Sequence, residues 1–465
     1  MPEVAELGDR GGPVSTVAPA ITGRTLRGAS KAATAREGAR AVKGADYAVL
    51  VGSVVALCMV GLLMVLSASS VASLRSYGTP WWYFERQGAY ICLGAVAFFV
   101  AQGVRMSAWQ RLARPLLIVT SFALMAVLVT GRSAGGASRW LGSWSFQFQP
   151  SELAKLALVL FAADVLARRQ GKRDWAYRSS PVLVAMVAFA LLILKQPDMG
   201  TAVVVCALGA VILFAAGLPL RWLGAVGGLA GLGGLVLAVS APYRLARLTS
   251  YLNPAAHAST TGYQSLQGLI ALATGHLAGA GLGQSLASWG YLPNQYTDFI
   301  FAVLGQETGL AGSLVVLALF GAIGVAGTRV AWRAQTTFES LVATGVTAWL
   351  VLQAVVNIGA VAGVMPVTGV PLPFVSYGGT SLVILLFAAG LLANVARRSA
   401  PVGSSRRLPV SSQPNPAQPN PAQANPAQAN PAQANPAQAR PTLPGPSQPG
   451  PSQPAGPETW AGEPL

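Results

Sequence analysis

The chain has 465 residues, of which 53% are hydrophobic and only 10% are charged, and its mean hydropathy is +0.51. Soluble domains carry about 25% charged residues, so this composition excludes a soluble globular protein and indicates an all-α, polytopic integral membrane protein. The net charge of +16 would suit a nucleic-acid-binding protein, but the basic residues gather at one end of successive apolar runs, which excludes that class.

The N-terminal segment, residues 1–46, is rich in Ala, Gly and Arg and shows no cleavable signal peptide. We expect it to be disordered and cytoplasmic. A membrane domain follows over residues 47–398, with ten apolar runs that approach the roughly 20 residues of a spanning helix. They lie near residues 47–67, 87–104, 115–130, 152–167, 181–196, 199–216, 222–240, 299–327, 339–362 and 380–396.

The basic residues are divided unequally between the two sides of the predicted spans. With a cytoplasmic N-terminus, the inside segments hold 23 of the 31 Lys and Arg residues and the outside segments hold seven. This asymmetry predicts that both termini are cytoplasmic and that anionic lipid headgroups surround the basic residues. Two outside loops are long, one near 131–151 and one near 241–298 between the seventh and eighth spans. Because long loops tend to carry function, we expect the chemistry outside.

The C-terminal segment, residues 399–465, is rich in Pro, Ala and Gln, and from Asn415 onward the sequence "NPAQ" recurs five times. Such a tract has no apolar face to bury, so we expect a disordered cytoplasmic tail. It acts either as a spacer or as a docking site for a cytoplasmic partner.

Acidic residues are rare in the membrane domain, and four of them cluster at or just below the outer face. They are Glu152, Asp198, Asp298 and Glu307. Of the others, we interpret three near cytoplasmic helix ends as structural, and Glu85 as a surface partner of Arg86. The structural three are Asp164, Asp174 and Glu339.

Cations accompany the outer acids in "GGASRWLGSWSFQFQPSELAKL". Lys155 follows Glu152 by three residues, so both side chains point along one helix face. The two form a structural pair, or Lys155 joins Arg139 and Lys195 in binding an anionic lipid headgroup. In "LKQPDMGT", Asp198 follows a helix-breaking proline, where it either caps the next helix or belongs to the site.

Asp298 stands alone in "YLPNQYTDFIF", at the start of an apolar run. It either caps the eighth span or serves as a general base for a sugar hydroxyl. The preceding stretch "TTGYQSLQGLIALATGHLAGAGLGQS" is typical of a re-entrant or interfacial segment. His257 and His276 lack the spacing of zinc ligands.

Five motifs appear in order: "FQPSELAKLAL", "QPDMGTA", "GYQSLQGLIALATG…GAGLGQS", "YLPNQYTDFIFAVLGQETG" and "NIGAVAGVMPVTGVPLPFVSYGGTS". This set resembles the SEDS family of bacterial cell-wall polymerases, which includes FtsW, RodA and SpoVE. The segments "MVLSASSV" and "LPLPFVSYGGTS" are most similar to the FtsW branch, which acts in cell division. A RodA-like role in elongation is the alternative.

The resemblance implies ten transmembrane helices in the bacterial cytoplasmic membrane, at the division septum. It also implies a peptidoglycan glycosyltransferase that polymerises lipid II, with a class B penicillin-binding protein and other division proteins as partners. The family's essential aspartate falls on Asp298, the expected general base. Substrate-binding residues are expected at four further matched positions and at Gln264. The matched four are Arg139, Glu152, Lys155 and Asp198.

Two positions depart from the family pattern. Tyr296 stands where the family usually has histidine, and Gln306 stands where it usually has glutamate. No cofactor is expected with certainty; a divalent cation, Mg²⁺ or Mn²⁺, on the lipid pyrophosphate is an open alternative, although no dedicated site is visible. Two other functions stay open, a lipid II flippase and a non-catalytic division scaffold.

Overall fold

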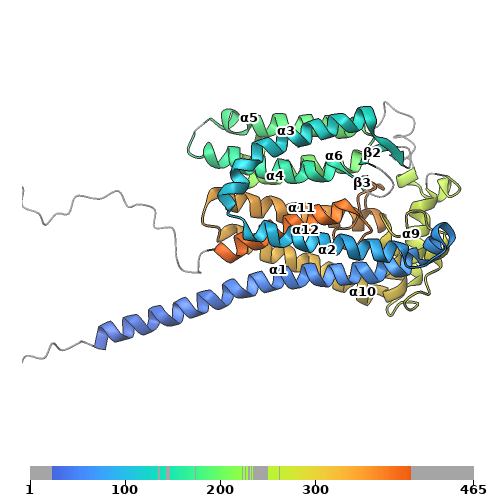
Figure 1. Ribbon diagram of the computed structural model, residues 1–465, viewed down its shortest axis with the longest axis horizontal. Helices are drawn as coiled ribbons and strands as arrows, with labels where there is room; N and C mark the ends of the chain where they lie inside the picture. Colours follow the sequence, from blue (N-terminus) through green and yellow to red (C-terminus); the bar gives the residue numbers. More distant parts are fainter. Residues whose placement is uncertain are drawn as a thin grey trace, which may run out of the picture. The chain divides into compact units, whose positions relative to one another are not determined.

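A computed structural model describes residues 23–134, 137–142, 147–172, 174–222, 250–260 and 262–399, with a few single positions between 224 and 233 (Figure 1). The predicted disordered segments at residues 1–22 and 400–465 lie outside the described residues. Most of the seventh predicted span, 222–240, does so as well.

The described fold is helical, with one small sheet. The helices are α1 (Gly23–Tyr77), α2 (Trp82–Gly103), α3 (Met106–Thr130), α4 (Pro150–Arg168), α5 (Trp175–Lys195), α6 (Met199–Ala215), α9 (Tyr263–Thr274), α10 (Ile300–Trp332), α11 (Thr337–Val361) and α12 (Thr380–Arg398). Short 3₁₀ turns are η1 (Ala255–His257) and η2 (Leu286–Trp289). The strands β1 (Arg132–Ala134), β2 (Ala137–Gly142) and β3 (Gln147–Phe148) pair antiparallel in the order β1-β2-β3.

The predicted all-α membrane fold is confirmed, and nine of the ten predicted spans coincide with described helices. Among the described residues, six helices are long and apolar enough to cross a membrane, and α6 is a shorter apolar helix. The sequences of α2 and α4 are interrupted by polar and charged residues, among them Gln87, Glu152 and Lys155. Both helices bring buried polar groups close to the site described below.

The first helix begins earlier than expected. The sequence predicted disorder up to residue 46, whereas α1 has helical backbone from Gly23 onward. Its N-terminal part is rich in Ala and Arg, which are good helix formers even without an apolar face to bury. The predicted boundary at residue 46 therefore falls inside a continuous helix.

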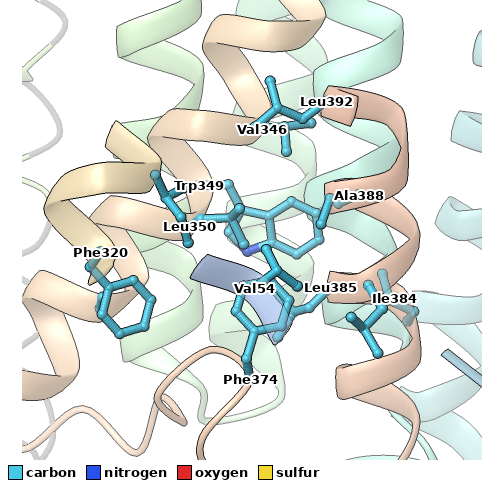
Figure 2. Close-up of a cluster of buried hydrophobic side chains, with 14 of the residues drawn as sticks. Val54, Phe320, Val346, Trp349, Leu350, Phe374, Ile384, Leu385, Ala388 and Leu392 are labelled. Atoms are coloured by element: carbon cyan, nitrogen blue, oxygen red, sulfur yellow. The ribbon is translucent and has the colours of Figure 1, made fainter. Parts of the chain in front are cut away.

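Helices far apart in the sequence pack side by side: α2 lies along α12, and α1 lies along α10 (Figure 1). Small residues permit the first contact, since a Cβ added to Gly390 would lie 2.4 Å from the carbonyl oxygen of Phe98. Trp349 of α11 lies at the centre of the core, among Val54, Leu385 and Phe374 (Figure 2). Phe374 belongs to the segment between α11 and α12, so the core anchors that segment.

The loop segment 276–281 packs beside a break in α10. Gly309 has φ of 67° and ψ of −163°, which interrupts the helical hydrogen bonds. The backbone of this loop segment forms hydrogen bonds with α10 on both sides of the break. The amide of Leu310 donates to the carbonyl of His276, and the amide of Ala280 donates to the carbonyl of Gln306. A Cβ on Gly279 would meet the carbonyl oxygen of Glu307 at 2.1 Å, so the close approach requires glycine.

Candidate functional site

A cavity of about 430 Å³ opens at the end of the bundle where α1 ends and α10 begins. Its wall combines the α1–α2 junction, the β2–β3 hairpin, the turn before α10 and the segment before α12. The described lining contains one carboxylate, Asp298, and two guanidinium groups, Arg86 and Arg139. Four amides and seven aromatic residues complete most of the surface. The alternating direction of the helices brings these segments together at one end.

Arg139 and Asp298 converge on Gly369. A Cβ at Gly369 would lie 3.5 Å from Nη1 of Arg139 and 3.6 Å from Oδ2 of Asp298. By the sum of these two distances, the guanidinium and the carboxylate lie within about 7 Å of each other. Gly369 also has φ of +71°, a conformation that side-chain-bearing residues rarely adopt. The fold therefore brings an opposite pair of charges to one point of the cavity wall.

Phe299 occupies the N-cap position of α10 and makes no side-chain capping bond, and Asp298 immediately precedes it. Asp198, in contrast, is the N-cap of α6 and accepts hydrogen bonds from the amide and the hydroxyl of Thr201, at 3.1 and 2.9 Å. The capping interpretation of Asp198 is confirmed.

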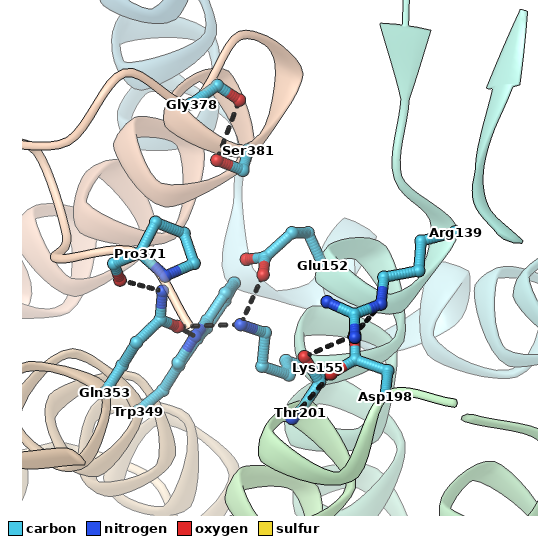
Figure 3. Close-up of polar contacts among 10 residues, drawn as sticks. All are labelled: Arg139, Glu152, Lys155, Asp198, Thr201, Trp349, Gln353, Pro371, Gly378 and Ser381. Atoms are coloured by element: carbon cyan, nitrogen blue, oxygen red, sulfur yellow. Dashed lines mark hydrogen bonds and ion pairs between the residues drawn. The ribbon is translucent and has the colours of Figure 1, made fainter. Parts of the chain in front are cut away.

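Asp198 also lies behind Arg139. Its Oδ2 is 3.8 Å from Nε of Arg139, and Nη2 of Arg139 donates to the carbonyl of Pro197 at 2.9 Å (Figure 3). Asp198 is buried and is not among the residues that line the cavity. In this structure it orients Arg139 from behind the described lining of the cavity.

Glu152 and Lys155 form a buried ion pair, with Nζ of Lys155 2.7 Å from Oε1 of Glu152 (Figure 3). Nζ also donates to Oε1 of Gln353 at 2.7 Å and lies 5.1 Å from the ring centroid of Trp349. Lys155 is 0% exposed, so direct binding of a lipid headgroup does not fit this arrangement. Of the two alternatives, the structure contains the ion pair, and neither side chain is among the described lining residues that were expected to bind substrate. Through Gln353, which donates to the carbonyl of Pro371 at 3.0 Å, the pair supports a lining residue of the cavity.

The backbone that carries Asp298 is fixed by three donors. Nδ2 of Asn357 donates to the carbonyls of Asp298 and Val370, at 2.8 Å each. Oγ of Ser376 donates to the carbonyl of Thr297 at 2.6 Å, and the amide of Tyr377 donates to that of Tyr296 at 3.0 Å. Three successive carbonyls are thus held. Sequence reasoning missed Asn357, although a buried asparagine within an apolar helix is itself a signal.

The remaining predicted residues are placed as follows. Gln264 lines the cavity, and its Nε2 donates to the carbonyl of Pro293 at 3.2 Å. Lys195 is exposed and is not a lining residue. Arg86, which was expected to pair with Glu85 at the surface, lines the cavity, with its guanidinium 4.6 Å from the Trp82 ring.

Gln306, the departure from the family pattern, ties the long loop to α10. Its Oε1 accepts from the Ser285 hydroxyl and from the Ala287 amide, and its Nε2 donates to Oγ1 of Thr274 at 2.9 Å. The neighbouring Glu307 accepts from the Ser67 hydroxyl at 2.5 Å. Asp164 pairs with Arg114 and Arg168, in agreement with its predicted structural role. Among the described residues, no group of three or more His, Cys, Asp or Glu could hold a metal ion.

The sequence profile of the FtsW/RodA/SpoVE family, described as "Cell cycle protein", matches residues 48–400. The chain belongs to this family. It is 39% identical over 350 residues to Stage V sporulation protein E of Bacillus subtilis (strain 168), which covers 74% of this chain and 94% of that protein. It is 38% identical over 362 residues to the probable peptidoglycan glycosyltransferase FtsW of Geobacter sp. (strain M18), covering 77% of this chain and 98% of that protein.

Solved structures of family members have the same fold. The crystal structure of the rod shape determining protein RodA of Thermus thermophilus matches with a TM-score of 0.56 and 31% identity, over 75% of this chain and 96% of that one. A chain from a structure titled as a peptidoglycan synthase complex, in which polymerization and crosslinking are coordinated, matches with a TM-score of 0.62 and 32% identity. That match covers 75% of this chain and 97% of the other. The chain is therefore a multi-pass membrane protein of the FtsW/RodA/SpoVE family.

Proposed function

We propose that this protein is a peptidoglycan glycosyltransferase that polymerises lipid II into glycan strands. The observation that carries the proposal is the convergence of Arg139 and Asp298 on Gly369, within a cavity rich in aromatic and amide groups. Relatives that match almost over their whole length bear the name of this activity. A base and a cation that line one cavity are what glycosyl transfer to a hydroxyl needs.

In the proposed reaction, the Asp298 carboxylate accepts the proton of the 4-hydroxyl of the acceptor N-acetylglucosamine. The oxygen forms a bond to C1 of the donor's N-acetylmuramic acid, with inversion, and the bond from C1 to the pyrophosphate oxygen breaks. Undecaprenyl pyrophosphate leaves with the bonding electrons, and Arg139 stabilises the negative charge.

Residues behind the cavity hold this geometry. Asp198 orients Arg139, while Glu152 and Lys155 support Pro371 through Gln353. Lys155 is therefore a positioning residue in the proposal and not a phosphate ligand. A divalent cation such as Mg²⁺ or Mn²⁺ would find one carboxylate in the described lining, Asp298, and would take its other ligands from the pyrophosphate and water.

The orientation and setting are part of the proposal. The positive-inside asymmetry supports cytoplasmic termini, a cavity at the outer face and a C-terminal tail that acts as a spacer. A class B penicillin-binding protein is the proposed partner, together with other division proteins; the match to a synthase complex supports an assembly of this kind. We assign the division septum because the FtsW relatives match closely, with a RodA-like elongation role as the alternative.

Polymerisation of lipid II by the purified protein, with and without the partner, tests the proposal. Glycan chains that require the intact protein would support it. Transport of lipid II across a vesicle membrane without chain formation would favour a flippase, and neither activity would favour a scaffold.

A further inference from the structure

One side of the cavity is lined by five aromatic residues in mutual contact, here called the aromatic wall. Its members are Tyr77, Trp82, Tyr83, Tyr296 and Tyr377, all of which line the cavity. Tyr77 stacks on Trp82 with ring centroids 3.8 Å apart. Tyr83 contacts Trp82, Tyr296 and Tyr377 with centroid distances of 4.7, 4.6 and 5.0 Å. Residues from α1, α2, the turn before α10 and the segment before α12 therefore meet in one surface.

Polar contacts fix the wall in place. The hydroxyls of Tyr83 and Tyr296 are 3.2 Å apart, and the Arg86 guanidinium lies over the Trp82 ring. The hydrogen bond from the backbone amide of Tyr377 to the carbonyl of Tyr296 joins two of the contributing segments. Burial raises the pKa of the Tyr377 phenol, so its hydroxyl stays protonated and able to donate. Rings that are already ordered lose little conformational freedom when a ligand binds.

The composition of the lining distinguishes between ligand classes. Aliphatic surface comes only from Val367 and Pro371 among the described lining residues, which is a poor match for an acyl chain. A phosphate group is bound mainly by cations, and the described lining has two, Arg86 and Arg139, against seven aromatic residues and four amides. A pyranose ring combines apolar C–H faces with a rim of hydroxyls, and it matches aromatic faces flanked by amides and guanidinium groups.

We propose that the aromatic wall is a saccharide subsite, which binds an N-acetylhexosamine ring with its apolar face against Tyr296 and Tyr83. Tyr296 precedes Asp298 by two residues, so their Cα atoms are at most about 7 Å apart. A ring bound there presents its edge to the Asp298 carboxylate. The assignment of the hydroxyl that faces Asp298 rests on the proposed function. The inference that the wall binds a saccharide does not depend on it. The wall includes the tyrosine that stands in place of the family's usual histidine, which gives this chain a larger stacking surface.

The probe is chitotriose, the β-1,4-linked trimer of N-acetylglucosamine, because it has neither lipid nor phosphate. Its binding to the full-length protein in detergent is measured by saturation-transfer NMR and by titration of tryptophan fluorescence. We expect binding to the wild type and to Asp298→Asn, at least tenfold weaker binding to Tyr296→Ala and to Tyr83→Leu, and near wild-type binding to Tyr296→Phe. Tyr177→Ala is the matched control, since Tyr177 is exposed and is not a lining residue.

Inorganic pyrophosphate serves as the second probe. Its binding should weaken in Arg139→Gln and stay unchanged in Tyr296→Ala. No chitotriose binding to the wild type, or equal affinity in folded Tyr296→Ala and Tyr83→Leu, would overturn the subsite. Chitotriose binding that depends on the wall, in a protein that makes no glycan from lipid II, would uphold the subsite and remove the proposed function.

Discussion

Replacing Lys155 by methionine should destabilise the protein, because Lys155 is the buried partner of Glu152. Both side chains are almost completely buried and their charged atoms are 2.7 Å apart. Oε2 of Glu152 has no hydrogen-bond partner among the described residues, so Lys155→Met leaves the carboxylate wholly unpaired. Removing one member of a buried pair costs about 3–5 kcal/mol. Gln353 loses less, because its Oε1 still accepts from Nε1 of Trp349 at 2.7 Å.

The double variant Glu152→Gln/Lys155→Met is the matched comparison. It removes both charges, and replacing a buried ion pair by groups of similar volume is often nearly neutral. Thermal unfolding in detergent should therefore show a large fall for Lys155→Met and recovery of most of the loss in the double variant. Unchanged unfolding of Lys155→Met together with loss of lipid II binding would refute the reasoning and make Lys155 a ligand.

Three further outcomes are expected. Asn357→Leu removes both hydrogen bonds that fix the carbonyls of Asp298 and Val370. The kcat of polymerisation should fall about 10²-fold, as for a catalytic group misplaced by about 1 Å, while the affinity for chitotriose is unchanged. A normal kcat would contradict this role. Truncation after Ser404 should leave polymerisation in detergent intact, and a folded truncation without activity would overturn the spacer role of the tail. A cysteine at the exposed Ser259 should react with an impermeant reagent in intact cells; labelling only after lysis would reverse the proposed topology.

Much of the fold could be predicted because long apolar runs identify spanning helices with little context. The structural role of Asp164 was interpreted correctly and capping by Asp198 was one of two alternatives, since ion pairing and capping near a helix end depend on local sequence. The surroundings of a residue inside a helix depend on distant segments. The sequence placed Lys155 on the same helix face as Glu152, but it did not show that Gln353 and Trp349 cover that face.

The site was predicted in part for the same reason. Arg139 and Asp298 were identified as cavity residues, yet their meeting at Gly369 requires three segments separated by long stretches of chain. Arg86 was missed because its neighbour Glu85 offered a simpler local partner. Tyr296 was recognised only as a departure from the family pattern; its contacts with Tyr83 and Tyr377 arise from the packing of three different segments.

The central claim is that Asp298 acts as the general base, and Asp298→Asn tests it most directly. Asparagine is nearly isosteric with aspartate and is an equally good helix cap, so the variant should fold normally and still bind chitotriose. The measurement is glycan-chain formation from lipid II by the variant in complex with its partner, with the partner's transpeptidase inhibited. We predict a loss of 10²–10⁴-fold, the range typical of acid–base groups. Chain formation at the wild-type rate would contradict the account.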